Sequence, residues 1–245
     1  MIAPVRGLLE SSLIEWEGRI SAVFFLPTCN FRCPNCHAPH LLAPVAEDDH
    51  IPLEPVRKLL KSREGWIDGV VISGGEPTVH GEALIALCRE IKGWGLEVRL
   101  STNGSRPETL GRLLAEDLIA SVAMDVKHRL RAYEYSLAAG VAADMEAVQS
   151  GIEMLKSSCI EVEFRTTVVP GLHDPEDIES IAKTLGPKAD YVLQAFRPGN
   201  CLSAEMNKRA ATLPETLQAM AERANAHVAR CRVRGVAGCA CREFK

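Results

Sequence analysis

The sequence predicts an α/β fold, a partial (β/α)6 barrel, in a single domain of 245 residues. Short apolar runs of strand length alternate with longer amphipathic segments along the chain, which is typical of βα units that build a parallel sheet. A hydrophobic content of 47% is sufficient for a sizeable core. No internal repeat and no linker rich in Gly, Ser or Pro divides the chain. We therefore expect one domain over residues 1–245, in which residues 200–245 form a C-terminal helix and a cysteine-containing tail.

The apolar runs, together with prolines and acidic residues at helix starts, predict six strands and six helices. The strands are expected at residues 19–26, 66–73, 96–101, 119–126, 160–169 and 191–196. The helices are expected at residues 53–62, 82–92, 107–118, 142–157, 174–185 and 213–230. Six strands are too few to close a barrel of eight, so we expect one side to be open.

Three cysteines follow the first predicted strand within eight residues, at Cys29, Cys33 and Cys36. Pro34 lies between them and excludes a regular helix, so a loop must carry the thiols. Three thiolates without a fourth cysteine nearby suit an iron–sulfur cluster that keeps one iron open to a small ligand. A zinc site of three cysteines and one histidine, with His37 or His40 as fourth ligand, is the alternative.

The second predicted strand ends in Gly74-Gly75-Glu76-Pro77. Two glycines at a strand end allow the backbone to approach a ligand closely because no Cβ is in the way. A tight turn would also explain the glycines, but it does not explain the Glu-Pro pair that follows. We expect a ligand pocket lined by main-chain carbonyls at this point.

Polar residues also lie near the carboxyl ends of three other predicted strands, namely Thr102, Asn103, Asp125, Lys127 and Arg165. Loops at the carboxyl ends of parallel strands build the binding site in such folds, so these side chains are expected to converge. A carboxylate can accept hydrogen bonds from ribose hydroxyls, and a guanidinium or ammonium can bind a carboxylate. A turn at the Asn-Gly pair, a local ion pair, and a purely structural network of charges inside the barrel are the alternatives. The inward face of strand 160–169 is expected to carry Glu161, Glu163, Arg165, Thr167 and Val169.

The spacing CxxxCxxC, followed by a strand that ends in Gly-Gly-Glu-Pro, resembles the radical S-adenosylmethionine (SAM) superfamily. The resemblance implies that the three cysteines hold a four-iron, four-sulfur cluster whose unique iron is chelated by the amine and carboxylate of SAM. It further implies that Gly74, Gly75 and Glu76 bind the methionyl end of SAM. Asp125 and Lys127 would serve the ribose and nearby polar groups, and Thr102 and Asn103 would line the same pocket.

Further segments resemble the activating proteins of anaerobic ribonucleoside-triphosphate reductase, a branch of the glycyl-radical-enzyme activases. The matching pieces are residues 12–14, 29–37, 124–127, 164–171 and 193–198. This resemblance implies that a one-electron donor such as flavodoxin or ferredoxin reduces the cluster, and that the radical derived from SAM takes a hydrogen from one glycine of the partner enzyme. The alternatives are a radical SAM enzyme that modifies a peptide or small molecule, and an electron carrier or zinc-stabilised binding module.

Two features depart from these families. Asn35 occupies a position that is commonly aromatic in the superfamily, so adenine must be held differently, by Phe31 or by the backbone. Four late cysteines, Cys201, Cys231, Cys239 and Cys241, are enough in number for an auxiliary cluster or zinc site. The other interpretation, which we favour, is that they are scattered structural thiols and a reduced pair in the tail.

Composition limits the partners and the compartment. The formal net charge is −4, from 28 basic and 32 acidic residues without a basic run, so we expect no nucleic-acid partner. The apolar run 20–26 is far shorter than the ~20 residues that a membrane helix needs, so we expect no membrane span. Nine cysteines in a chain of this length without a signal peptide favour reduced thiols and a cytoplasmic location.

Overall fold

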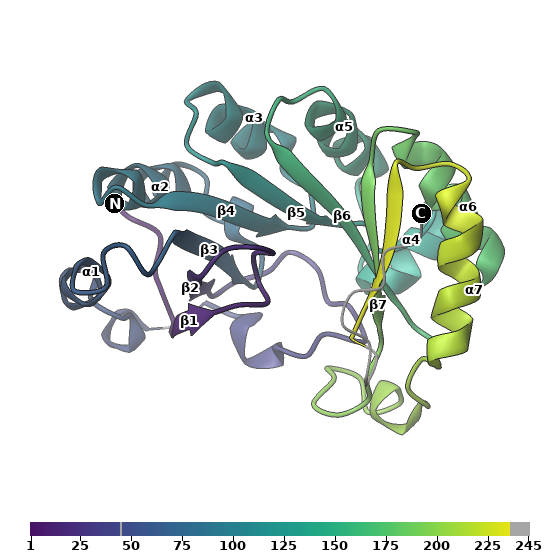
Figure 1. Ribbon diagram of the computed structural model, residues 1–245. Helices are drawn as coiled ribbons and strands as arrows, with labels where there is room; N and C mark the ends of the chain where they lie inside the picture. The colour runs from purple at the N-terminus through teal and green to yellow at the C-terminus, as the bar shows by residue number, and fades with distance from the viewer. Residues whose placement is uncertain (45, 236–245) are drawn as a thin grey trace.

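The computed structural model describes residues 1–44 and 46–235, whose strands form one eight-stranded sheet (Figure 1). The strands follow one another in the sheet in sequence order. The first pair is antiparallel, and all later pairs are parallel. The strands are β1 Gly7–Ser12, β2 Ser21–Leu26, β3 Gly69–Gly74, β4 Glu97–Thr102, β5 Ser121–Asp125, β6 Glu161–Val168, β7 Asp190–Ala195 and β8 Arg230–Arg234.

The predicted partial barrel is confirmed, and its six strands are β2 to β7. Two strands were not predicted. β1 is an edge strand with mostly exposed or half-buried residues, so it lacks the apolar alternation of a strand that faces a core. β8 has the sequence Arg-Cys-Arg-Val-Arg. Its alternating arginines meet their acidic partners only in the folded protein, so the sequence alone does not mark it as a strand. The helix predicted over residues 213–230 ends at Asn225 because the chain then turns into β8.

Figure 1 shows α2, α3 and α5 along the outer side of the curved sheet, with α6 and α7 beside the C-terminal strands. α4 was not predicted because its eight residues carry no clear amphipathic pattern, with Tyr133 exposed and Tyr135 buried. None of the described helices is long and apolar enough to cross a membrane. The helices are α1 Leu53–Lys61, α2 Glu82–Gly93, α3 Pro107–Ala115, α4 Ala132–Ala139, α5 Met145–Lys156, α6 Pro175–Leu185 and α7 Pro214–Asn225, with short 3-10 helices at Pro39–Leu41, Glu47–Asp49, Pro77–His80 and Met206–Lys208.

The connection between β1 and β2 passes beneath the amino ends of the strands. Trp16 is fully buried there against Val23 and Val71, and its Nε1 donates to Glu161 Oε2 on β6 at 3.3 Å. The next residue, Glu17, forms an ion pair with Arg232 on β8. The connection therefore links β2 and β3 to the opposite end of the sheet and covers the amino end of the barrel.

A buried ion network fills the interior above this connection, as the alternation along β6 predicted. The carboxylate of Glu163 on β6 forms an ion pair with Arg99 Nη2 at 3.2 Å and accepts a hydrogen bond from Arg232 Nη2 at 3.2 Å. It also accepts hydrogen bonds from both terminal nitrogens of Arg234, at 3.1 and 2.9 Å. Burial alone would raise the pKa of Glu163, but hydrogen bonds and charge from Arg234 and the charge of Arg99 lower it. Charges that are buried in this way remain ionised because they are paired.

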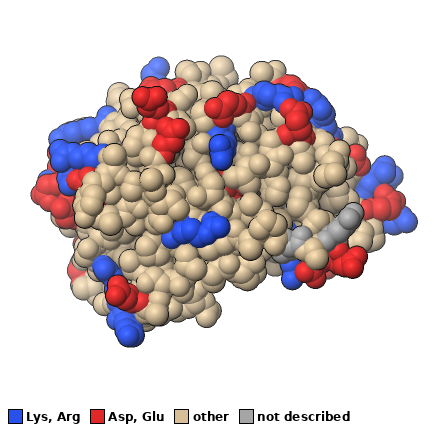
Figure 2. All heavy atoms as spheres, turned by 180° about the vertical axis from the view of Figure 1, so that it is seen from behind, with Lys and Arg blue, Asp and Glu red and all other residues tan. Residues whose placement is uncertain are grey.

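The outer surface shows a different distribution of charge. On the face in Figure 2, most basic and acidic side chains lie toward the margin, and a basic group also lies near the centre. The two signs are intermixed at the margin, in keeping with a chain whose basic and acidic residues nearly balance.

Two stacked histidines join the loops that follow β5 and β6. The rings of His128 and His173 lie 4.9 Å apart, and both side chains are buried. His173 Nδ1 accepts from Val169 N at 3.0 Å, so its Nε2 carries the proton that is donated to the Lys127 carbonyl at 2.9 Å. Burial lowers the pKa of His173 to about 4, and the neighbouring His128 contributes to the same shift.

We expect this histidine to make the fold sensitive to acid. Because its folded pKa is depressed, its contribution to stability is complete above the unfolded value near 6.5 and is lost as pH falls toward about 4. The free energy of unfolding should drop by about 2 kcal/mol from this group alone between pH 7.5 and pH 5. Urea unfolding at both pH values should show a clearly smaller drop for His173→Gln than for the wild type. Equal drops in the two proteins would show that His173 does not carry the effect.

Candidate active site

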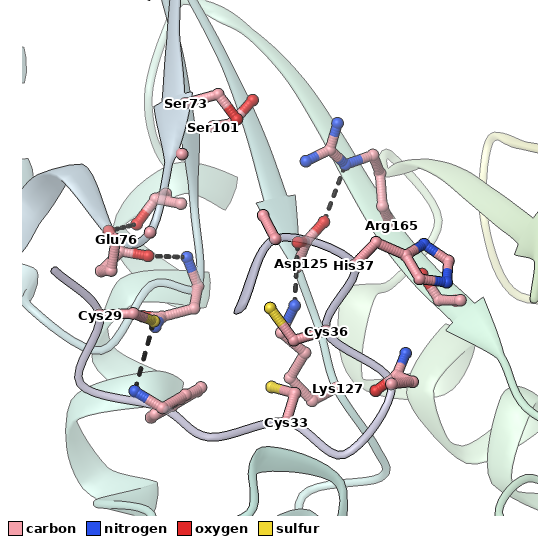
Figure 3. A pocket seen from close by; sticks show the side chains of 18 of the residues that line it. Cys29, Cys33, Cys36, His37, Ser73, Glu76, Ser101, Asp125, Lys127 and Arg165 are labelled. Atoms are coloured by element: carbon pink, nitrogen blue, oxygen red, sulfur yellow. Dashed lines mark hydrogen bonds and ion pairs between the residues drawn. The ribbon is translucent and has the colours of Figure 1, made fainter. Parts of the chain in front are cut away.

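A cavity of about 350 Å³ lies at the carboxyl ends of the parallel strands. Its walls come from the cysteine loop after β2, the ends of β3 to β7, and Glu15 from the β1–β2 connection. Figure 3 shows the thiols of Cys33 and Cys36 close to Lys127, with Glu76 across the cavity from Arg165. All the residues predicted for the site line this cavity, namely Cys29, Cys33, Cys36, Gly74, Gly75, Glu76, Thr102, Asn103, Asp125, Lys127 and Arg165.

The cysteine loop is held by two segments that the sequence did not connect with it. Arg32 N donates to the Ala139 carbonyl at the end of α4 at 2.8 Å, and a Cβ at Gly140 would collide with the Arg32 carbonyl. From the segment after β7, Leu202 N donates to the Cys36 carbonyl and Ser203 N to the Pro34 carbonyl, both at 2.9 Å. The loop is therefore fixed by main-chain hydrogen bonds from distant parts of the chain.

The three thiols are half-buried and free. Burial raises the pKa of Cys29 to about 11 and also raises that of Cys33. Thiols in such surroundings stay protonated until a metal displaces their protons, because the thiolate is the form that binds metal. The cysteine loop thus offers three sulfur ligands for a metal centre.

The alternative of a zinc site at this loop does not match the donors. Among residues 1–44 and 46–235, no three His, Cys, Asp or Glu side chains are arranged to hold a single metal ion. His37 is engaged elsewhere, since its Nε2 lies 2.8 Å from the Arg197 carbonyl and its ring stacks on Phe196 with centroids 6.2 Å apart. Three thiols spread along the wall of a larger cavity suit a cluster, in which each sulfur binds a different iron.

The late cysteines lie apart from one another where the structure describes them. Cys201 is buried in a small apolar cluster with Val169, Phe196 and Met206, and Cys231 is buried in the main core. Both agree with the interpretation as structural thiols. Cys239 and Cys241 lie outside the described residues.

The two glycines after β3 are required by protein packing. A Cβ at Gly74 would meet the backbone of Leu26, and Gly74 also has a positive φ of 120°. A Cβ at Gly75 would collide with the Thr28 carbonyl oxygen and lie 2.6 Å from its carbonyl carbon. The sequence suggested room for a ligand as the reason for these glycines. The structure shows that they also let the end of β3 approach β2 and the start of the cysteine loop.

Glu76 is buried, with a relative exposure of 1%, and its carboxylate is engaged by protein donors. Oε1 accepts from Thr78 N at 3.1 Å, Thr78 Oγ1 at 2.6 Å and Thr102 Oγ1 at 2.7 Å, and Oε2 accepts from Asn103 N at 2.6 Å. Burial raises the pKa of Glu76, and these hydrogen bonds oppose the rise. The carboxylate therefore ties the end of β3 to the end of β4.

The same network continues into the cysteine loop through Asn30, which sequence reasoning missed. Asn103 Nδ2 donates to Asn30 Oδ1 at 3.0 Å, and Asn30 Nδ2 donates to Ser105 Oγ at 2.8 Å. Ser105 Oγ in turn donates to Asn103 Oδ1 at 2.6 Å. Asn30 directly follows Cys29, so this ring of polar side chains fixes the first cysteine relative to β4.

Asn30→Ala should loosen the cysteine loop without preventing cluster assembly. The change removes two side-chain hydrogen bonds, worth about 2 kcal/mol together. We expect the reconstituted protein to lose iron several times faster to a chelator, followed by the decay of its absorbance. Asn225→Ala is the matched control, because Asn225 also makes two side-chain bonds, to the backbone of Cys231. Equal rates of iron loss in the two variants would contradict a specific role for Asn30.

Asp125, Lys127 and Arg165 form an ion triad on the other wall of the cavity (Figure 3). Arg165 Nε donates to Asp125 Oδ1 at 2.8 Å and Lys127 Nζ to Oδ2 at 2.9 Å. Burial would raise the pKa of Asp125, but the charges of Arg165 and Lys127 lower it to about 2. The ion pair that the sequence offered as an alternative is thus present. The Asp125 carboxylate keeps lone pairs that can accept a hydrogen bond from a further donor.

Among the polar residues of the cavity that were not predicted for the site are Ser73, Ser101, Thr167 and Gln194. They lie near the carboxyl ends of β3, β4, β6 and β7. Thr167 was expected on the inward face of its strand, and the same period-two reasoning applied to β7 would have placed Gln194 there. Asn35 and Phe31 also line the cavity, so both remain available to an adenine ring.

A family model described as the radical SAM superfamily matches residues 23–185, which include the cysteine loop and the strands that bear the ion triad. The chain belongs to the radical SAM superfamily. Its cofactors are a four-iron, four-sulfur cluster and SAM, which the enzymes of this superfamily use. The donors fit this assignment, since three thiols face a polar cavity large enough for a nucleoside ligand.

Similar proteins bear names from within this superfamily. A Methanocaldococcus jannaschii protein named "Putative glycyl-radical enzyme activating enzyme" is 35% identical over 213 residues, which make up 85% of this chain and 86% of that protein. A Thermococcus kodakarensis protein named "Probable GTP 3',8-cyclase" is 34% identical over 161 residues, 64% of this chain and 50% of that protein.

Solved structures share the fold. A domain of pyruvate-formate lyase-activating enzyme from Bacteroides vulgatus matches with a TM-score of 0.54 at 18% identity, over 68% of this chain and 99% of that chain. Streptococcus suis SuiB bound to precursor peptide SuiA matches with a TM-score of 0.65 at 12% identity, over 88% of this chain and 48% of SuiB. At these identities the likeness concerns the fold alone.

Proposed function

We propose that this radical SAM enzyme is an activase that generates a glycyl radical on an anaerobic ribonucleoside-triphosphate reductase. The alignment with the Methanocaldococcus jannaschii relative covers most of both chains, and the name of that relative supports the function of an activase. The segments that resemble reductase-activating proteins support this particular target. A cytoplasmic location belongs to the same proposal, and it is supported by the free thiols of all seven described cysteines.

The observation that carries the proposal is an accessible inner face of the sheet. Gln194 lies on β7 between the buried residues Leu193 and Ala195, yet its own side chain is exposed and lines the cavity. Among the described residues β1 and β8 are the two edges of the sheet and do not pair with each other. A site that is reached from the side in this way can admit a loop of another protein.

A four-iron, four-sulfur cluster held by Cys29, Cys33 and Cys36 would supply the electron for the reductive cleavage of SAM. The residues of the chain position the reactants. In this proposal the main chain at Gly74 and Gly75 holds the methionyl end of SAM, and Asp125 and Lys127 bind the ribose. Arg165 holds Asp125 in place from β6. No side chain has to act as a general acid or base, because the transferred atom is a hydrogen atom.

Glu76, Thr102 and Asn103 support the pocket in this proposal. These residues are at most 5% exposed, and the Glu76 carboxylate accepts from Thr102 Oγ1 and from the main-chain N–H of Asn103, so they shape the wall that SAM contacts. What they present to SAM is mainly backbone. A one-electron donor such as flavodoxin or ferredoxin completes the proposed system.

Electron paramagnetic resonance tests the proposal. The protein is mixed without oxygen with a reduced donor, SAM and an anaerobic ribonucleotide reductase from the same source, and a doublet from a carbon-centred radical on the reductase is expected. A reductase whose target glycine is replaced by alanine is the control and should give no doublet. Slow cleavage of SAM at the same rate with and without the reductase, with no radical on it, would show that the target is a peptide or a small molecule instead.

A further inference from the structure

The polar side chains that line the cavity fall into two groups. Members of the first group use their hydrogen bonds or charges on one another or on neighbouring protein groups, and they are Glu76, Thr102, Asn103, Asp125, Lys127 and Arg165. Members of the second group have no side-chain hydrogen bond within the described part of the chain, and they are Glu15, Asn35, Ser73, Ser101, Thr167 and Gln194. A ligand that enters the cavity finds unused donors and acceptors mainly in the second group.

Thr167 and Gln194 form a pair within that second group. They are direct neighbours in the register of β6 and β7, so their side chains stand side by side on the inner face. β4 and β5 separate them from β3, where the main chain of Gly74 and Gly75 is proposed to bind the methionyl end of SAM. The pair therefore lies away from the expected methionyl site, within the same cavity.

The pair also lies close to an edge of the sheet. The neighbour of Gln194 on the other side is Arg234 of the edge strand β8. Arg234 is bound by Glu163 through both of its terminal nitrogens and does not line the cavity. What this part of the cavity offers to a ligand is the uncharged hydroxyl of Thr167 and the uncharged carboxamide of Gln194.

We propose that Thr167 and Gln194 bind the main chain of the partner protein on either side of its target glycine. The inference rests on the proposed function and names the groups that recognise the target. Glycine has no side chain, so an enzyme can hold it only through main-chain N–H and C=O groups. A carboxamide carries one donor group and one acceptor group, and a hydroxyl can donate or accept, which matches a peptide segment without adding charge.

The test separates recognition of the target from binding of SAM. Gln194→Leu and Thr167→Val remove the polar groups at nearly constant volume, and Thr167→Ser keeps the hydroxyl. We expect the KM for the reductase to rise roughly tenfold in each of the first two variants, since each leaves a peptide group without its partner. SAM affinity and the cluster spectrum should stay unchanged, and Thr167→Ser should retain the KM of the wild type.

Gln218→Leu is the matched control, because Gln218 lies on α7 and bonds only to Glu222 of the same helix among the described residues. An unchanged KM in both Gln194→Leu and Thr167→Val would overturn the assignment, as would a loss of SAM affinity equal to the rise in KM. If the wild type itself formed no radical on the reductase, the proposed function would fail, and this inference with it. A working wild type with unaffected variants would refute only the inference.

Discussion

Cys33→Ala should remove most of the iron from the anaerobically reconstituted protein, which is expected to hold about four irons with matching sulfide. Cys33 lies in the middle of the loop and faces the cavity, so no other described cysteine can take its place without moving the backbone. Iron and sulfide analysis, together with the visible absorbance of the cluster, measures the loss. Cys159→Ala is the control, because Cys159 is an exposed free thiol and should not affect the count.

The same assay decides between the interpretations of the other cysteines. Replacing Cys239 and Cys241 together by Ala should leave the iron count unchanged. A fall by half would establish an auxiliary cluster in the C-terminal part of the chain. One zinc per chain in the wild type, in place of iron, would contradict the whole assignment of the cysteine loop.

Gly75→Ala should impair both the cluster and SAM binding. The added methyl group would collide with the Thr28 carbonyl, which belongs to the residue before Cys29, and it would lie 3.0 Å from the Leu41 carbonyl oxygen. Because these are backbone atoms, the cysteine loop has to move, at a cost of about 3 kcal/mol. We expect a reduced iron content and SAM affinity at least tenfold weaker, measured by iron analysis and by calorimetry.

Gly93→Ala is the matched control for this prediction. A Cβ at Gly93 meets no atom within 4 Å, and the residue lies in the last turn of α2. The substitution should leave the cluster and SAM binding intact and should slightly stabilise the helix, by about 0.5 kcal/mol. If Gly75→Ala behaved like Gly93→Ala, the close contact between β3 and the cysteine loop would not matter for the site.

Much of the cavity could be predicted from the sequence, because two local rules apply to it. Parallel strands place their carboxyl ends at one rim, and side chains alternate along a strand, so Asp125, Lys127 and Arg165 had to converge if their strands were adjacent. The spacing of the cysteines then marked the loop that closes the rim. These rules depend only on neighbouring residues, which a sequence displays directly.

The remaining features depend on contacts between distant segments. In the sequence β8 is a charged segment without the apolar pattern of a buried strand. In the structure Arg232 and Arg234 both bind Glu163, which lies about seventy residues earlier in the chain. Asn30 has no local pattern that marks it, and its importance comes from Asn103 and Ser105 on another strand end. The burial of Glu76 and its four donors cannot be seen in the motif, because they come from the ends of two strands.

In the proposed reaction this chain takes a hydrogen atom from a glycine of the reductase. Transfer of deuterium from that glycine, labelled at Cα, into deoxyadenosine tests it most directly. We expect deoxyadenosine that carries the label, in an amount that matches the radical formed on the reductase. Unlabelled deoxyadenosine from a reaction in which the reductase is present and SAM is consumed would contradict it.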